Sequence, residues 1–408
     1  MVRKFKVFLI AYGGGHIKML LPIIRQLKLE GNVELVVFGL TTALAVLDSE
    51  GVDYISYSDF STDDHIALGK KLLAGIQLSS SVPESESFAY HGVNFHELKN
   101  RHGALAWDIW IDKGRQSFYP LEFFKSALKD LSPDLVIATN SPRSERAALD
   151  AAAFLGISSI CLVDMFALQE AAWISQPNYA TKICVLNNSV KDFFVKKGCD
   201  SSTIVVTGNP AFDSVYDESF FHKGRDLRKD YGLSSRDFLI LYASQPEPVM
   251  HPFCNRVGDP ALPRNIEHYL RDYVRDKLGV YLAVRYHPSE NVQFIASENV
   301  IYSNVTDELY SIVHASDLVV VTASTVGLEA SLVGKQVISL DCSIFTEDAP
   351  FSKMGISNGV SCIEALGHQL DEQIDVFSRS EDRYSIAPRK DATGAVCAEI
   401  YKALDLLR

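Results

Sequence analysis

The first thirty residues constrain the fold most strongly, because an apolar run, three glycines and a helical repeat follow one another directly. The apolar run is 6–11, and Gly13 to Gly15 end it. Behind the glycines, apolar residues recur at helical spacing, namely Ile17, Leu20, Leu21, Ile24 and Leu27. This order predicts a strand, a tight turn and a helix, which together are the opening unit of a parallel α/β sheet.

The same alternation continues along the chain in two series. In the first series we predict strands at 33–38, 52–56, 135–138, 159–163, 182–186 and 202–206, and helices at 43–49, 145–155 and 189–197. The stretch 59–117 breaks this rhythm and is expected to hold helical insertions and loops near a cleft. After the breaker 207–210, strands are predicted at 238–243, 281–286, 300–302, 318–322 and 336–340, and helices at 265–277, 309–315 and 325–333. A further helix is predicted at 399–407.

The predicted fold class is therefore α/β, with two doubly wound Rossmann-like domains and a cleft between them. A chain of 408 residues is long enough for two cores. We place the first domain at 1–206 on the acceptor side and the second at 207–390 on the donor side. We predict a C-terminal helix at 391–408, and one possibility is that it packs against the first domain.

Composition and charge exclude several classes of function. A net charge of -12 argues against non-specific nucleic-acid binding, which needs clustered Lys and Arg. Seven cysteines without a CxxC pair are typical of a reduced, cytoplasmic protein. No apolar run approaches the ~18 residues of a membrane span, so we expect at most peripheral membrane contact. The sequence contains no HExxH or similar cluster of metal ligands, so we expect that neither a metal nor another cofactor is required.

The glycine loop is the first candidate binding segment. Its glycines, Gly14 and Gly15 among them, would let backbone amides approach a ligand, and the helix start behind them favours negative charge. The loop is neither GxGxxG nor a P-loop, which disfavours a dinucleotide or ATP site. His16 could act as a general base on an acceptor hydroxyl, or it could only bind substrate or cap the helix, and both roles stay open.

Polar residues also follow other predicted strands, where open α/β sheets bind ligands. In the first half, Arg143, Glu145 and Asp164 are candidates for acid or base work, although a charged residue at a helix start is often only a solvated face. In the loop after 238–243, Gln245 is expected to line the nucleotide site, with Glu247 and His251 nearby.

The remaining candidates lie in the second half. Arg285 and His287 are candidate phosphate partners, or parts of a surface turn. Ser324 and Thr325 begin a predicted helix, where they can cap it and hold an anion at once. Glu329 lies one turn further on and could accept hydrogen bonds from a ribose.

Three segments resemble GT-B glycosyltransferases. GGGHIKMLLPI resembles their GxxGHxxPxxxL opening, TGNPAFD resembles the start of their second domain, and HP followed by TASTVGLEASLVGKQVI resembles their donor site. The resemblance runs from the first strand to Ile338. The HP and Ser/Thr-rich pair is similar to the cytidine-nucleotide site of capsule polymerases, sialyltransferases and Kdo-transferases.

The UDP-GlcNAc 2-epimerases are also similar, in their TGN segment and their Ser-Gly-Gly-x-x-x-Glu-Glu donor turn. Ser324, Thr325 and Glu329 match that turn only in part, because its glycine pair is missing. The opening also has Gly15-His16-Ile17 where these epimerases usually carry an Arg-Pro-Glu run.

The resemblance implies glycosyl transfer from a CMP- or UDP-linked sugar to a carbohydrate or lipid-linked acceptor, in cell-surface polysaccharide or glycoconjugate synthesis. It implies a base near His16, a ribose contact at Glu329, and donor phosphates at Arg285, His287, Ser324 and Thr325. The alternative is a 2-epimerase, in which Glu145, Asp164 or Glu247 would move the proton. A binding protein without turnover is the third option.

Overall fold

The computed structural model describes residues 4–252, 254–304, 306–379 and 390–405. The chain forms two compact units. Unit 1 comprises Met1–Asp213 with Asp391–Arg408, and unit 2 comprises Ser214–Lys390. The division thus falls after Asp213, whereas the sequence suggested a break after 206.

In the described part of unit 1, six parallel strands form one sheet in the order β2-β1-β3-β4-β5-β6. Their bounds are β1 (Phe5–Tyr12), β2 (Val33–Leu40), β3 (Leu135–Thr139), β4 (Ser158–Leu162), β5 (Lys182–Val185) and β6 (Ile204–Val206). In register, Val7 of β1 lies opposite both Leu35 and Leu135. From β1 the chain adds β2 on one side and β3 to β6 on the other. The sheet is therefore doubly wound, and its switch point lies between β1 and β3.

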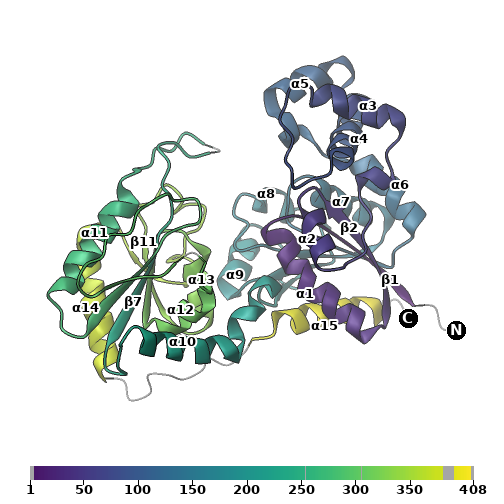
Figure 1. Cartoon of the computed structure of the whole chain (residues 1–408). Helices are drawn as coiled ribbons and strands as arrows, with labels where there is room; N and C mark the ends of the chain where they lie inside the picture. Colours follow the sequence, from purple (N-terminus) through teal and green to yellow (C-terminus); the bar gives the residue numbers. More distant parts are fainter. Residues whose placement is uncertain (1–3, 253, 305, 380–389, 406–408) are drawn as a thin grey trace. The chain divides into compact units, whose positions relative to one another are not determined.

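Helices cover both faces of this sheet, which explains why its strands are nearly continuous apolar runs (Figure 1). They are α1 (Gly15–Glu30), α2 (Ala43–Ser49), α6 (Leu121–Leu131), α7 (Ser144–Leu155), α8 (Ala171–Ile174), α9 (Asn188–Lys196) and α15 (Ala392–Asp405). Val7 and Leu9 pack in one core with α1 and α15, while Phe8 packs against Phe38 on the opposite face. The C-terminal helix begins earlier than predicted, and the end of the predicted range 399–407 lies outside the described residues.

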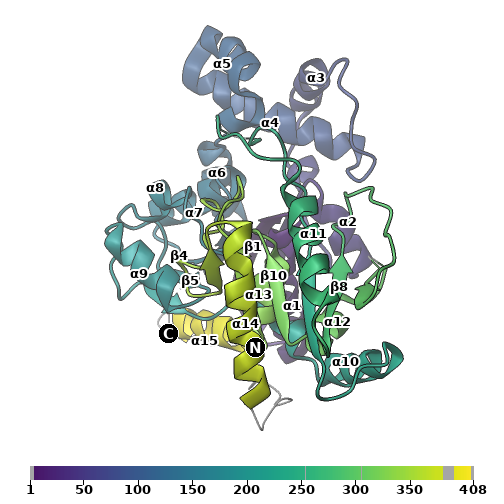
Figure 2. The same ribbon diagram turned by 90° about the vertical axis from the view of Figure 1, so that its left-hand side faces the viewer.

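The irregular stretch between β2 and β3 is helical, as predicted. It holds the short 3-10 turn η1 (Tyr57–Asp59), then α3 (Asp63–Leu72), α4 (Glu84–His102) and α5 (Ala106–Lys113). Figures 1 and 2 show α3, α4 and α5 together at one end of unit 1. The strand predicted at 52–56 is wrong, since only Ile55 pairs there, in an isolated bridge to Phe38.

In the described part of unit 2, six strands form a second parallel sheet in the order β12-β11-β10-β7-β8-β9. Their bounds are β7 (Phe238–Ala243), β8 (Val280–Arg285), β9 (Val300–Tyr302), β10 (Leu318–Val321), β11 (Gln336–Leu340) and β12 (Asn358–Val360). The order reverses between β7 and β10, which places the switch point of this sheet there.

Helices also flank the second sheet on both faces (Figure 1). They are α10 (Glu218–Asp230), α11 (Leu262–Arg275), α12 (Leu309–Ala315), α13 (Thr325–Leu332) and α14 (Leu366–Arg379). Ile240 and Leu282 of the sheet share a core with Leu270 of α11 and Leu370 of α14. Helices α10 and α14 and strand β12 were not predicted from the sequence.

Candidate functional site

The glycine loop of unit 1 lies at the switch point of its sheet, directly after β1. A Cβ added to Gly13 would lie 2.0 Å from Oγ1 of Thr42, so no larger residue fits there without moving the loop. Gly14 precedes α1 with φ 69° and ψ -136°, a conformation that only glycine adopts readily. The loop therefore leaves Gly14 and Gly15 exposed at the start of α1, where backbone amides can meet an anion.

His16 and Asp164 come together at this edge from α1 and from the end of β4. The carboxylate Oδ2 of Asp164 lies 3.2 Å from the position that a Cβ on Gly15 would take. The Asp164 backbone N–H donates to Asn140 Oδ1 at 2.7 Å, and Asn209 Nδ2 donates to Asp164 Oδ1 at 3.3 Å. Asp164 is thus held in place from two sides, next to the first turn of α1.

The imidazole of His16 is suited to accept a proton. Burial lowers the pKa of His16, and the nearby Asp164 carboxylate only partly offsets this effect. Its Nδ1 is buried and has no hydrogen-bond partner among the described residues. The ring is therefore expected to be neutral near pH 7, with Asp164 beside it to stabilise the charge that forms on protonation.

Glu145 is completely buried in the first turn of α7. Its Oε1 accepts a hydrogen bond from the Tyr12 backbone N–H at 2.8 Å and one from Thr139 Oγ1 at 3.4 Å, so it ties α7 to the ends of β1 and β3. Its Oε2 is buried without a partner in the part of the chain that the structure describes. Burial raises the pKa of Glu145 to about 7 despite those hydrogen bonds, so this carboxyl can hold or release a proton near neutrality.

A cluster of hydroxyl groups surrounds the end of β1, and the sequence reading missed it. The Tyr12 hydroxyl lies 2.7 Å from that of Tyr90 on α4, and the Tyr57 hydroxyl lies 2.9 Å from Ser144 Oγ. Arg143 stacks its guanidinium over the Tyr12 ring at 5.0 Å. Arg143 also helps burial to lower the pKa of His16, so its positive charge lies near the imidazole. The position of Tyr12 next to the glycines was the one signal that could have found the cluster.

In unit 2, Ser324 and Thr325 lie at the switch point between β7 and β10. Ser324 precedes α13 and its Oγ accepts from the Val326 backbone N–H at 3.4 Å, so it caps the helix as expected. Thr322 Oγ1 donates to Gln245 Oε1 at 3.5 Å, which joins the loops that follow β7 and β10. The structure thus brings Gln245 and the Ser324 turn together, at a helix start that favours negative charge.

Glu329 is buried on the second turn of α13. Burial raises the pKa of Tyr310 on α12, and the charge of Glu329 adds to this effect, so the Glu329 carboxylate lies near that helix. A ribose contact for Glu329 stays a prediction.

Arg285, at the end of β8, is held by the loop that follows β9. Its guanidinium donates to Ser303 Oγ at 3.1 Å, to the Asn304 carbonyl at 2.6 Å and to the Asp307 carbonyl at 2.9 Å. The observed role of Arg285 is to position this loop, and its phosphate role stays a prediction.

His287 is exposed, two residues further along. Its Nδ1 lies 2.7 Å from Ser289 Oγ and accepts from the Ser289 backbone N–H at 3.2 Å. This arrangement places the proton on Nε2, which can donate to an anion.

Two further candidates anchor loops at the same edge of the second sheet. The buried Glu247 accepts from Ser343 Oγ at 2.7 Å and from the Ile344 backbone N–H at 2.6 Å. The buried His251 lies 3.0 Å from Asp348 Oδ2. Both therefore join the loop after β7 to the loop after β11.

Arg264 was missed by the sequence reading, although it borders this edge. From α11 it donates to Ser244 Oγ at 2.6 Å and to Glu290 Oε1 at 3.0 Å, directly beside Gln245. Nothing in its sequence context marks it, because only the fold brings α11 to the ends of β7 and β8.

Within the described residues, no three His, Cys, Asp or Glu side chains are grouped so that they could hold a metal ion. No helix in the described ranges is both long and apolar enough to cross a bilayer.

Solved structures of nucleotide-sugar enzymes share the fold of the whole chain. The UDP-GlcNAc 2-epimerase of Neisseria meningitidis bound to UDP-GlcNAc matches with a TM-score of 0.56 and 14% identity, covering 98% of this chain and 100% of that one. A glycosyltransferase of Rickettsia africae ESF-5 matches with a TM-score of 0.56 and 12% identity, covering 100% and 99%. MurG of Acinetobacter baumannii matches with a TM-score of 0.55 and 14% identity, covering 98% and 100%.

No protein-family model matches the sequence, and neither does the sequence of any curated protein. At identities this low, the structural likeness shows the fold. The chain therefore has the two-domain GT-B fold, as its sequence predicted.

Proposed function

We propose that this chain is an enzyme that acts on a nucleotide-sugar, and specifically a glycosyltransferase that uses a CMP- or UDP-linked donor. The observation that carries the proposal is the half-buried imidazole of His16 at the ligand-binding edge of the first sheet. Its buried Nδ1 has no hydrogen-bond partner among the described residues, and the charge of Asp164 acts on the ring. An imidazole that is neutral near pH 7 and supported by a carboxylate is the usual form of a general base. The GT-B fold that the chain shares with known nucleotide-sugar enzymes supports the coarser assignment, an enzyme that acts on a nucleotide-sugar.

In the proposed reaction, a hydroxyl of a carbohydrate or lipid-linked acceptor attacks the anomeric carbon of the donor. Its proton passes to His16, and the Asp164 carboxylate stabilises the imidazolium that forms. The bond between the anomeric carbon and the phosphate oxygen breaks, and the nucleotide leaves with the electron pair. We assign its phosphates to the start of α13 at Ser324 and Thr325, where the backbone amides stabilise the leaving charge without a required metal or cofactor.

A 2-epimerase is the second candidate, and Glu145 is the observation that favours it. Its pKa of about 7 would let it take a proton from C2 of the sugar or return one, with Asp164 as the second carboxyl group. Such an enzyme would introduce solvent deuterium at C2 without any acceptor. The transferase leaves C2 untouched.

Nucleotide binding is tested by thermal unfolding with CMP, CDP, UDP, GDP and their sugars. We expect a cytidine or uridine ligand at about 100 times its Kd to stabilise the protein by about 2.7 kcal/mol, which raises Tm by roughly 5–10 °C. Ser324→Ala combined with Thr325→Ala should reduce the shift, because it removes the hydroxyl groups at the start of α13. Ser331→Ala, later in the same helix, is the matched control. If no nucleotide raises Tm, the assignment of the donor site is wrong.

A further inference from the structure

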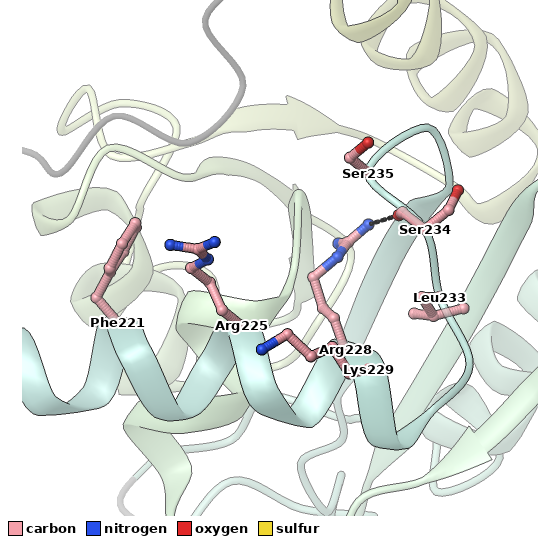
Figure 3. A pocket seen from close by; sticks show the side chains of 7 residues that line it. All are labelled: Phe221, Arg225, Arg228, Lys229, Leu233, Ser234 and Ser235. Carbon is pink, nitrogen blue, oxygen red and sulfur yellow. Dashed lines mark hydrogen bonds between the residues drawn. The ribbon is translucent and has the colours of Figure 1, made fainter.

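A cavity of about 460 Å³ lies beside α10 in unit 2. Phe221, Arg225, Arg228 and Lys229 of the helix line it, together with the turn 233–235. Figure 3 shows that the arginine side chains project from the helix toward the side where the turn lies. Its volume falls in the range of ~300–1,000 Å³ that is typical of small-molecule sites.

This cavity lies at the opposite edge of the second sheet from the donor turn. The turn 233–235 leads directly into β7, which begins at Phe238. Ser244 and Gln245 follow the other end of β7. A strand of this length spans about 20 Å, so the cavity is separate from the nucleotide site proposed above.

Arg228 forms the fixed wall of the cavity. It is buried, and its guanidinium donates to the Ala315 carbonyl and to Asp317 Oδ2, both at 2.8 Å. It also donates to the carbonyls of Ser234 at 3.2 Å and Asp237 at 2.6 Å. Arg228 therefore holds the turn in place, and Asp317 balances its charge.

Two other cations are open to a ligand. Arg225 lies one turn before Arg228, its side chain is exposed, and it makes no ion pair within the described ranges. Lys229 pairs with Asp226 at 2.7 Å, but these side chains are 70% and 67% exposed. Such a pair contributes little and is easily exchanged for a ligand anion. Asp230 adds one more carboxylate to this end of α10.

The turn and the start of the helix complete the recognition surface. Ser234 Oγ accepts from the Arg236 backbone N–H at 3.2 Å, so its hydroxyl proton can point to an anion. Phe221 and the buried Leu233 supply an apolar wall. A guanidinium fork, an ammonium and a hydroxyl match the oxygens of a phosphate, and the apolar wall matches an organic body attached to it.

We propose that this cavity is a second ligand site, which binds a phosphate group and prefers a phosphomonoester whose organic part packs against Phe221. Nothing in this inference depends on the reaction proposed for the switch points. Because the cavity lies at the opposite edge of the second sheet from the donor turn, a ligand bound there would take no part in the proposed reaction.

Isothermal titration of the full chain with phenyl phosphate and with inorganic phosphate tests this proposal. We expect phenyl phosphate to bind, and Arg225→Gln combined with Lys229→Gln to weaken it at least about tenfold, because two charge-assisted contacts are lost. Arg236→Gln, which removes an exposed arginine directly after this turn and outside the cavity lining, should leave the affinity unchanged. Ser324→Ala should also leave it unchanged, since it alters only the donor turn.

Three results would overturn the proposal. They are no binding at millimolar ligand, unchanged affinity in the double variant, and loss of binding in Ser324→Ala, which would place the ligand at the donor turn instead. If inorganic phosphate binds as tightly as phenyl phosphate, the preference for a phosphomonoester is wrong and the site binds free phosphate. If phenyl phosphate binds more tightly, the ligand is an organic phosphate. Because Arg225 and Lys229 lie outside the proposed reaction site, failure here would leave the proposed function intact.

Discussion

His16→Ala is expected to lower kcat by about 10²–10⁴-fold and to change the nucleotide Kd by less than about twofold. The reason is that the proposed nucleotide contacts belong to unit 2, whereas His16 lies at the edge of the first sheet and would act on the acceptor proton. Steady-state kinetics and direct nucleotide titration on the same preparations measure the two quantities. Lys18→Ala, which removes an exposed cation two residues further along α1, should change neither.

The pH dependence of kcat/KM belongs to the same prediction. Burial lowers the pKa of His16 below its ordinary 6.5, so the activity should fall only at pH values below that point, where the base becomes protonated. The charge of Asp164 raises the pKa of His16, so Asp164→Asn should move the fall of kcat/KM to still lower pH. An equal loss of turnover and nucleotide affinity in His16→Ala would contradict the assigned role.

Glu145→Gln is expected to remove a large pH-dependent loss of stability. A carboxyl whose pKa rises from 4.5 to about 7 on folding contributes stability that is complete below pH 4.5 and is lost as the pH rises through 7. The difference amounts to about 3 kcal/mol. Glutamine cannot ionise, yet its side-chain oxygen can still accept from the Tyr12 backbone N–H. Wild type should therefore lose about 3 kcal/mol more than Glu145→Gln between pH 4.5 and pH 8.

Urea unfolding at a series of pH values measures this difference. Glu84→Gln, which removes an exposed carboxylate at the start of α4, should follow the wild-type pH dependence. If the free energy of unfolding depends on pH in the same way for wild type and Glu145→Gln, Glu145 ionises in the folded protein without loss of stability.

The sheets could be predicted from sequence because their strands are buried on both faces. The apolar run of β1 is nearly continuous, so it is easily recognised as a buried strand. The glycines that follow it mark where the strand ends. The polar helix α10 was missed because most of its residues are exposed. The strand predicted at 52–56 failed because the chain leaves the sheet there, toward the helical insertion, and alternation alone cannot reveal that exit.

The candidate site was predictable only in part, for a similar reason. Residues that directly follow strands, such as His16, Asp164 and Ser324, can be located from the strand ends alone. Their partners come from distant segments, as Tyr90 does from the insertion and Arg264 from α11. For Arg285, the sequence predicted the place at the end of a strand. It did not predict the loop whose Ser303 and Asn304 accept hydrogen bonds from the guanidinium.

Glycosyl transfer is distinguished from epimerisation by incubation with CMP- and UDP-sugars in deuterium oxide, with and without carbohydrate acceptors. Released nucleotide and deuterium in the remaining sugar are then measured by chromatography and mass spectrometry. We expect nucleotide release by wild type, near-complete loss of release in His16→Ala, and no deuterium at C2. Deuterium at C2 of UDP-GlcNAc without any acceptor would contradict glycosyl transfer and establish the epimerase instead.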